Sequence, residues 1–167
     1  FSFEPWRDLL ALPGLGTSLR LTLFTGIGAT LLSVILAAGA SAALHARLSR
    51  RASGRLLTPF LATPHAAMAI GLAFLLAPSG WIARAVAPLA GWDRPPMIAT
   101  VNDPWGLALI AGLVIKELPF LLLVMLAALG QIPVRAHLAA GRSLGYGRGL
   151  VWIKVIMPQV WPLVRLP

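Results

Sequence analysis

The sequence predicts an all-α membrane protein, a polytopic bundle of transmembrane helices. Of its 167 residues, 58% are hydrophobic and only 11% are charged, whereas soluble domains carry about 25% charged residues. The mean hydropathy is +0.83. Several uncharged runs also approach or exceed the roughly 20 apolar residues that a helix needs to cross the hydrocarbon layer. A chain of this kind places its helices against lipid as well as against each other.

The first two spans are predicted at residues 21–44 and 56–77. The first is an uncharged run that follows Arg20 and precedes a basic cluster. The second is also uncharged but contains Pro59 and Pro64. Because proline has no N–H and breaks the helical hydrogen-bond ladder, we expect a kinked or discontinuous second span, with the freed carbonyls satisfied by neighbouring groups.

The third span is predicted at residues 105–130, after a loop at 78–104 that holds a short interfacial helix at 81–90. Lys116, Glu117 and Pro119 interrupt the centre of this span. Residues 132–158 are small, basic and rich in glycine, and apolar character returns after residue 158 as the start of a fourth span. The chain begins at Phe1 and stops at Pro167 within that segment. We therefore expect a fragment, a single membrane domain over residues 1–167 that is incomplete at both ends.

Basic residues predict the orientation, because Lys and Arg are retained in cytoplasmic loops. The loops after the first and third spans hold basic residues and no acidic ones: Arg47, Arg50, Arg51, Arg55, Arg135, Arg142, Arg148 and Lys154. Both loops are predicted to be cytoplasmic. The net charge of +9 does not indicate nucleic-acid binding, since the basic clusters lack interleaved aromatic residues. Cysteine is absent, and no metal site is assigned.

The most informative segment is the glycine-rich stretch at residues 132–158. Residues 134–144 predict a short helix, and Gly145 lies where a helix commonly ends in a left-handed residue. Residues 148–157 predict a second short helix, ended by Pro158. A helical hairpin rich in Ala and Gly permits close backbone approach by a docking partner.

This segment resembles the EAA loop of the inner-membrane permeases of type I ABC importers. The family pattern is Glu-Ala-Ala, three residues, Gly, nine residues, Ile, one residue and Leu-Pro. Aligned on its Gly and Pro, the pattern falls on Ala139, Ala140, Gly141, Gly145, Val155, Met157 and Pro158. The spacing holds throughout, but Ala139 replaces the acidic residue. The Thr63-Pro64-His65 and Lys116-Glu117-Leu118-Pro119 segments are similar to the same family and occur in the same order.

The resemblance implies a type I permease fold and a coupling role for the loop at 132–158. In that family the loop docks into a cytoplasmic ABC ATPase dimer, and Arg142 and Arg148 are candidate additional contacts. ATP and magnesium would belong to the ATPase, so this chain would bind no cofactor and would not itself be an enzyme. A second permease copy or domain, an external substrate-binding protein and membrane lipid are the other implied partners. The implied location is the bacterial inner membrane, crossed several times.

Candidate residues for the translocation path or its gate are Pro64, His65, Lys116, Glu117 and Pro119. A charge at mid-membrane costs about 2.5 to 3.5 kcal/mol, and adjacent helical positions do not face each other. Each charge is therefore expected to find a partner on another helix or to border the path. Lys116 and Glu117 are compatible with two roles, a structural contact between helices and substrate contact or gating. The sequence is also compatible with two other functions. One is an ion-coupled secondary transporter using Lys116 and Glu117, and the other is a non-transporting membrane scaffold.

Overall fold

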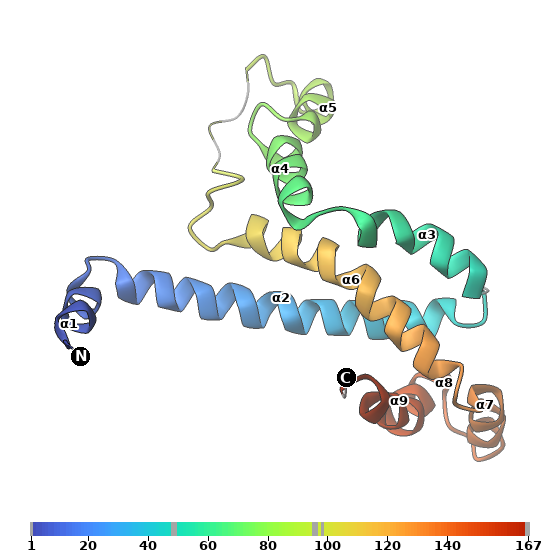
Figure 1. The fold of residues 1–167 in the computed structure, drawn as a ribbon. Helices are drawn as coiled ribbons and strands as arrows, with labels where there is room; N and C mark the ends of the chain where they lie inside the picture. Colours follow the sequence, from blue (N-terminus) through green and yellow to red (C-terminus); the bar gives the residue numbers. More distant parts are fainter. Residues whose placement is uncertain (1, 48–49, 95–96, 98, 166–167) are drawn as a thin grey trace. The chain divides into compact units, whose positions relative to one another are not determined.

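The computed structural model describes residues 2–47, 50–94, 97 and 99–165, and every regular element among them is helical. Figure 1 shows the order of the helices along the chain. Their bounds are α1 Glu4–Ala11, α2 Leu15–Leu44, α3 Arg50–Ala62, α4 His65–Leu76, α5 Trp81–Ala90, α6 Leu107–Leu129, α7 Val134–Ser143, α8 Arg148–Val151, a π-helical turn η1 Trp152–Ile156, and α9 Met157–Val164. The all-α prediction is confirmed.

Among the described residues, three stretches are long and apolar enough to cross a membrane: Leu15–Leu44, His65–Ala90 and Leu107–Leu129. The first is α2, which contains the whole of the predicted span at 21–44 and begins earlier. The third is α6, which lies within the predicted span at 105–130 and continues through Pro119 without a break. The chain therefore has the helices of a multi-pass membrane protein.

The second stretch differs from the predicted span at 56–77. Helix α3 continues through Pro59 and ends at Ala62, and α4 begins at His65. The expected discontinuity is therefore present at Pro64 but not at Pro59. The apolar stretch starts at His65, because the first turns of α3 carry arginines, and it extends into α5. The short helix predicted at 81–90 is confirmed as α5.

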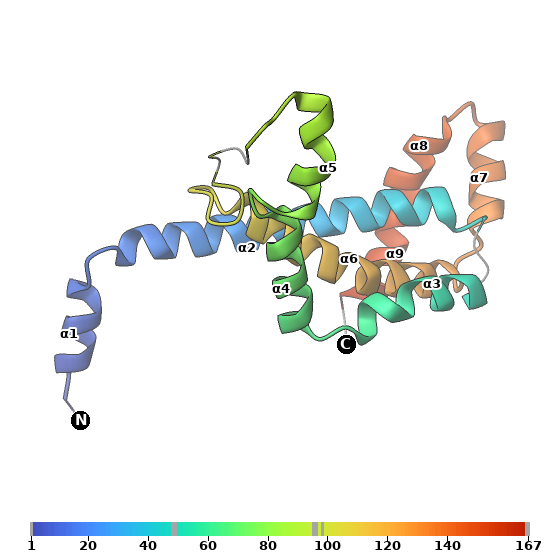
Figure 2. The same cartoon turned by 90° about the horizontal axis from the view of Figure 1, so that it is seen from above.

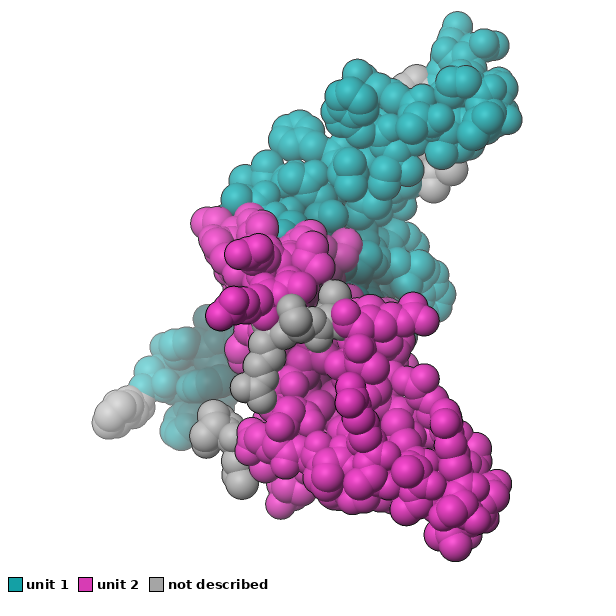
Figure 3. Space-filling model, turned by 90° about the vertical axis from the view of Figure 1, so that its right-hand side faces the viewer, with its two compact units in different colours: residues 1–31, 66–114 teal, residues 32–65, 115–167 magenta. Residues whose placement is uncertain are grey.

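The described residues divide into two compact units, coloured separately in Figure 3. Unit 1 comprises Phe1–Leu31 and Ala66–Val114, and unit 2 comprises Leu32–His65 and Ile115–Pro167. Helices α2 and α6 contribute residues to both. The candidate site described below lies in unit 2.

Unit 1 contains a tight turn that starts α6. The backbone N–H of Gly106 donates to the carbonyl of Asp103 at 3.1 Å, and Gly106 has a left-handed φ of 66°. The Asp103 carboxylate accepts the N–H groups of Leu107 at 2.7 Å and Ala108 at 3.0 Å. Hydrogen bonds from Ala108 and then Leu107 hold the pKa of Asp103 below its ordinary value of 3.8. The carboxylate thereby satisfies helix N–H groups that otherwise have no partner.

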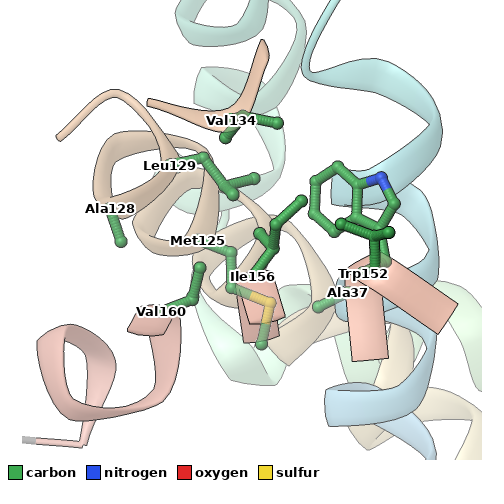
Figure 4. Close-up of a cluster of buried hydrophobic side chains, with 9 residues drawn as sticks. Ala37, Met125, Ala128, Leu129, Val134, Trp152, Ile156 and Val160 are labelled. Carbon is green, nitrogen blue, oxygen red and sulfur yellow. The ribbon is translucent and has the colours of Figure 1, made fainter. Parts of the chain in front are cut away.

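Unit 2 has a hydrophobic core built from α2, α6 and the helices that follow. Its buried members are Ala37, Met125, Ala128, Leu129, Val134, Val151, Trp152, Ile156 and Val160. Figure 4 shows side chains from these helices turned toward one another, and Ile156 is fully buried. The core joins the end of α2 to the glycine-rich segment.

The predicted end of a helix at Pro158 is wrong. The chain passes from α8 through η1 directly into α9, with Pro158 in the first turn of α9. Proline has no N–H to donate to the carbonyl of Lys154, but the first turn of a helix tolerates this loss. The π-helical turn lies immediately before it, where the N–H of Met157 donates to the carbonyl of Trp152. Helix α9 occupies the start of the predicted fourth span, and residues 166–167 lie outside the described residues.

Candidate functional site

The glycine-rich segment forms a hairpin of two short helices, α7 and α8, joined by residues 144–147 (Figure 2). Gly145 has a φ of +79°. Its N–H donates to the carbonyl of Arg142 at 3.0 Å, and the N–H of Tyr146 donates to the carbonyl of Gly141 at 2.8 Å. This pair of bonds is a Schellman motif, which closes the carboxyl end of α7. The predicted helix end and the left-handed Gly145 are both confirmed.

Gly141 allows α7 to lie directly against α8. A Cβ atom added at Gly141 would be 2.3 Å from Cγ2 of Val151, and both residues are buried. Side-chain atoms cannot approach so closely, and the branched Val side chain has little rotameric freedom to move away. The contact therefore requires glycine at the position where the EAA pattern has its second alanine.

Two contacts attach this hairpin to the end of α2. Nη2 of Arg148 donates to the carbonyl of Ala42 at 3.0 Å. This carbonyl is one of the last in α2, and it also lies 3.2 Å from Nδ1 of His45. The rings of His45 and Trp152 pack edge to face with centroids 5.0 Å apart. Sequence reasoning did not pair these residues, because they lie about a hundred positions apart and no local pattern links them.

The tip of the hairpin is exposed and partly apolar. Leu144 is 71% exposed, Tyr146 52% and Leu150 43%. Among the predicted coupling residues, the exposed ones are Ala139, Ala140, Arg142, Gly145, Arg148, Val155 and Pro158. Gly141 is buried and Met157 is half-buried against the core. Leu144, Tyr146 and Leu150 are therefore exposed at the hairpin, whereas Gly141 and Met157 pack inside it or against the core.

The Lys116 side chain donates hydrogen bonds to the backbone at the break between α3 and α4. Its ammonium donates to the carbonyl of Phe60 at 3.1 Å and to that of Thr63. Pro64 cannot donate to the Phe60 carbonyl, which it would reach in a continuous helix. A cation at this position also interacts favourably with the carboxyl end of α3. Lys116 therefore has backbone partners at the end of α3 and just after it, which is one of the two expectations for this charge.

The adjacent residue Glu117 contacts a side chain instead of the backbone. Its carboxylate lies 3.8 Å from Nε2 of His65, the first residue of α4. The two side chains are 49% and 75% exposed, respectively. Pro119, two residues further along α6, is buried. Of the candidate path residues, Lys116 is therefore engaged with backbone, whereas His65 and Glu117 form an exposed polar pair at the break.

Within the described residues, no three His, Cys, Asp or Glu side chains gather closely enough to hold a metal ion. Comparison with protein-family models, with curated proteins and with solved structures finds no match to this chain. The class that the fold and the site define is a multi-pass helical membrane protein with an exposed helical hairpin in unit 2.

Proposed function

We propose that this chain is a permease subunit of an ATP-driven ABC importer and that the α7–α8 hairpin couples it to a cytoplasmic ATPase dimer. The observation that carries the proposal is the hairpin itself, closed by a Schellman motif at Gly145 and presenting Leu144, Tyr146 and Leu150 to the exterior. An exposed apolar tip with arginines beside it suits a protein partner, since aromatic and Arg side chains are enriched in interfaces. The motif spacing from Ala139 to Pro158 supports the same assignment.

Movement of the hairpin would reach the membrane helices through rigid contacts. Gly141 and Val151 hold α7 against α8, Arg148 binds the end of α2, and Ile156 is buried in the core with Met125 of α6. Close-packed groups of this kind transmit displacement as a unit. ATP hydrolysis and its magnesium belong to the partner ATPase. The permease contributes the moving helices.

The translocation path in this proposal passes the break between α3 and α4. Broken helices present free backbone groups near mid-membrane, and such positions bind substrates in several transporter folds. Lys116 fixes the carbonyls on one side of the break, and His65 with Glu117 supplies the exposed polar groups. A second permease copy or domain would complete the path, and a substrate-binding protein would deliver to it from outside the bacterial inner membrane.

Cross-linking tests the coupling surface directly. The chain has no cysteine, so Leu144→Cys or Tyr146→Cys introduces a single reactive thiol at the tip. In cells that produce the protein, a thiol-reactive photo-cross-linker at either position is expected to capture a chain that is labelled by azido-ATP. Phe24→Cys, exposed on α2 in unit 1, is the control and should capture none. Capture of no ATP-binding chain at either tip position would refute the proposal.

The isolated complex permits a second test. Gly145→Val places a branched residue at a φ of +79°, although no atom lies within 4 Å of the new Cβ. The substitution therefore strains the Schellman turn without a clash. We expect the ATPase to stay bound while its hydrolysis rate no longer depends on the permease. Gly149→Val on α8, which has equal space and no left-handed φ, should retain more of that dependence.

A further inference from the structure

A groove lies between the last turns of α2 and the α8–η1 segment of unit 2. Its volume is about 600 Å³, within the range of about 300 to 1,000 Å³ typical of sites for small molecules. Small residues of α2, including Gly39 and Ala42, form one wall, and Trp152, Ile153 and Met157 form the other. Arg47 and Arg148 are its charged lining residues. The groove is thus an apolar channel with cations at one end.

We propose that this groove binds an anionic phospholipid, with its phosphate between Arg47 and Arg148 and part of an acyl chain along Gly39, Ile153 and Met157. This inference does not rest on coupling to an ATPase. It goes beyond the general contact with lipid that any membrane helix makes, because it assigns one headgroup charge to two named side chains.

The charge of the groove favours an anionic occupant. No acidic residue is among the described residues that line it, and Glu117 is the single acidic residue in the sequence of unit 2. One N–H of Arg148 is used by the carbonyl of Ala42. A guanidinium has five N–H donors, so Arg148 is fixed in place and still has donors for a phosphate. Arginine beside phosphate forms paired, charge-assisted hydrogen bonds.

The position of the groove favours a lipid over a soluble anion. It opens at the end of α2, a helix long and apolar enough to span a membrane, and basic residues at such an end lie at the depth of the lipid headgroups. The apolar wall of Ile153 and Met157 offers nothing to a free phosphate ion but suits an acyl chain. A second copy of this chain would bring its own arginines to the same face, where like charges repel.

Native mass spectrometry of the purified chain in detergent tests the inference. Phosphatidylglycerol, phosphatidylcholine or inorganic phosphate is added, and retained adducts are counted. The intact chain is expected to retain phosphatidylglycerol in preference to phosphatidylcholine. Arg47→Gln, which alters an exposed side chain, should weaken retention of phosphatidylglycerol about tenfold, the effect of losing one charge-assisted hydrogen bond. Arg142→Gln removes an equal charge outside the groove and should leave retention unchanged.

The apolar wall has its own matched pair of variants. No atom lies within 4 Å of a Cβ added at Gly39 or at Gly26, both on α2. Gly39→Leu fills the groove and should abolish the preference for phosphatidylglycerol, whereas Gly26→Leu, outside the groove, should not. Equal retention by the Gly39→Leu and intact chains would overturn the inference. So would competition by inorganic phosphate at the same concentration as the lipid, or a change in oligomeric state with Arg47→Gln while lipid retention stays the same.

Discussion

The Lys116 ammonium donates a hydrogen bond to the carbonyl of Thr63, the residue before the proline that separates α3 from α4. The same ammonium also binds the carbonyl of Phe60 at 3.1 Å. A lysine in a long apolar helix is thereby matched to backbone acceptors that a proline has freed. The charge and the helix break compensate each other, and neither is favourable alone.

Replacing Lys116 with Met should therefore destabilise the chain. The substitution leaves two carbonyls without this donor, and a lost hydrogen bond to a charged group costs about 1.5 to 3 kcal/mol. Thermal unfolding of the purified chain in detergent measures the change. Lys154→Met, at an exposed position of η1, is the control and should have little effect. Equal stability of the Lys116→Met and intact chains would show that other groups donate hydrogen bonds to the Phe60 and Thr63 carbonyls.

Asp103 predicts a pH dependence at the start of α6. The N–H groups of Ala108 and Leu107 stabilise its carboxylate and lower its pKa. A group whose folded pKa is lowered contributes stability above its unfolded value, here 3.8, and loses that contribution as the pH falls through the lower folded value. Protection of the Leu107 and Ala108 amides against hydrogen exchange should be constant near neutral pH and decline below pH 3.8.

The matched variants of Asp103 separate charge from hydrogen bonding. Asp103→Asn keeps one carbonyl oxygen as an acceptor and should retain part of the protection at neutral pH without the acid-dependent decline. Asp103→Ala removes both acceptors and should lose most of it. A decline below pH 3.8 that persists in the Asn variant would assign the effect to another group.

Local sequence patterns predicted most of the helices. Proline at Pro64, glycine at Gly145 and the apolar runs of α2 and α6 act over a few residues, so their consequences can be inferred without tertiary structure. The break at Pro64, the end of α7 and the helix α5 agree with those expectations. The error at Pro158 arose because a proline in the first turn of a helix resembles one that follows a helix end.

The contacts that organise the candidate site were beyond sequence reasoning. Arg148 with Ala42 and His45 with Trp152 join segments about a hundred residues apart, and their pairing depends on how α2 and the hairpin pack. The sequence did indicate that Lys116 has a partner on another helix or borders the translocation path, and that the proline break frees carbonyls. It did not indicate that the Lys116 ammonium binds those freed carbonyls, because other polar groups could equally have partnered either of them.

His65 and Glu117 offer a test of the proposed path. An ionisable side chain exposed at membrane depth faces either water or a protein partner, since contact with lipid is costly. In the proposed permease, His65→Cys and Glu117→Cys should each react with a membrane-impermeant maleimide in inverted or right-side-out vesicles. Leu122→Cys, buried on the same helix as Glu117, should remain unlabelled. Absence of labelling at both positions in both kinds of vesicle would remove this pair from a water-filled path.

The contact between Gly141 and Val151 predicts a pair of compensating substitutions. Gly141→Ala introduces the alanine of the EAA pattern, but its Cβ would be 2.3 Å from Cγ2 of Val151. Forcing a methyl group into packed side chains costs about 1 to 3 kcal/mol, so the single variant should unfold at a lower temperature. Val151→Ala removes the obstructing methyl groups. The double variant should therefore lose less stability than the two single variants lose added together. The difference is a coupling energy, which a double-mutant cycle measures.

Gly149→Ala, whose Cβ would meet no atom within 4 Å, is the control and should show no coupling to Val151→Ala. Additive effects of Gly141→Ala and Val151→Ala would mean that α7 and α8 separate freely, and the hairpin could not then act as the rigid element that coupling requires.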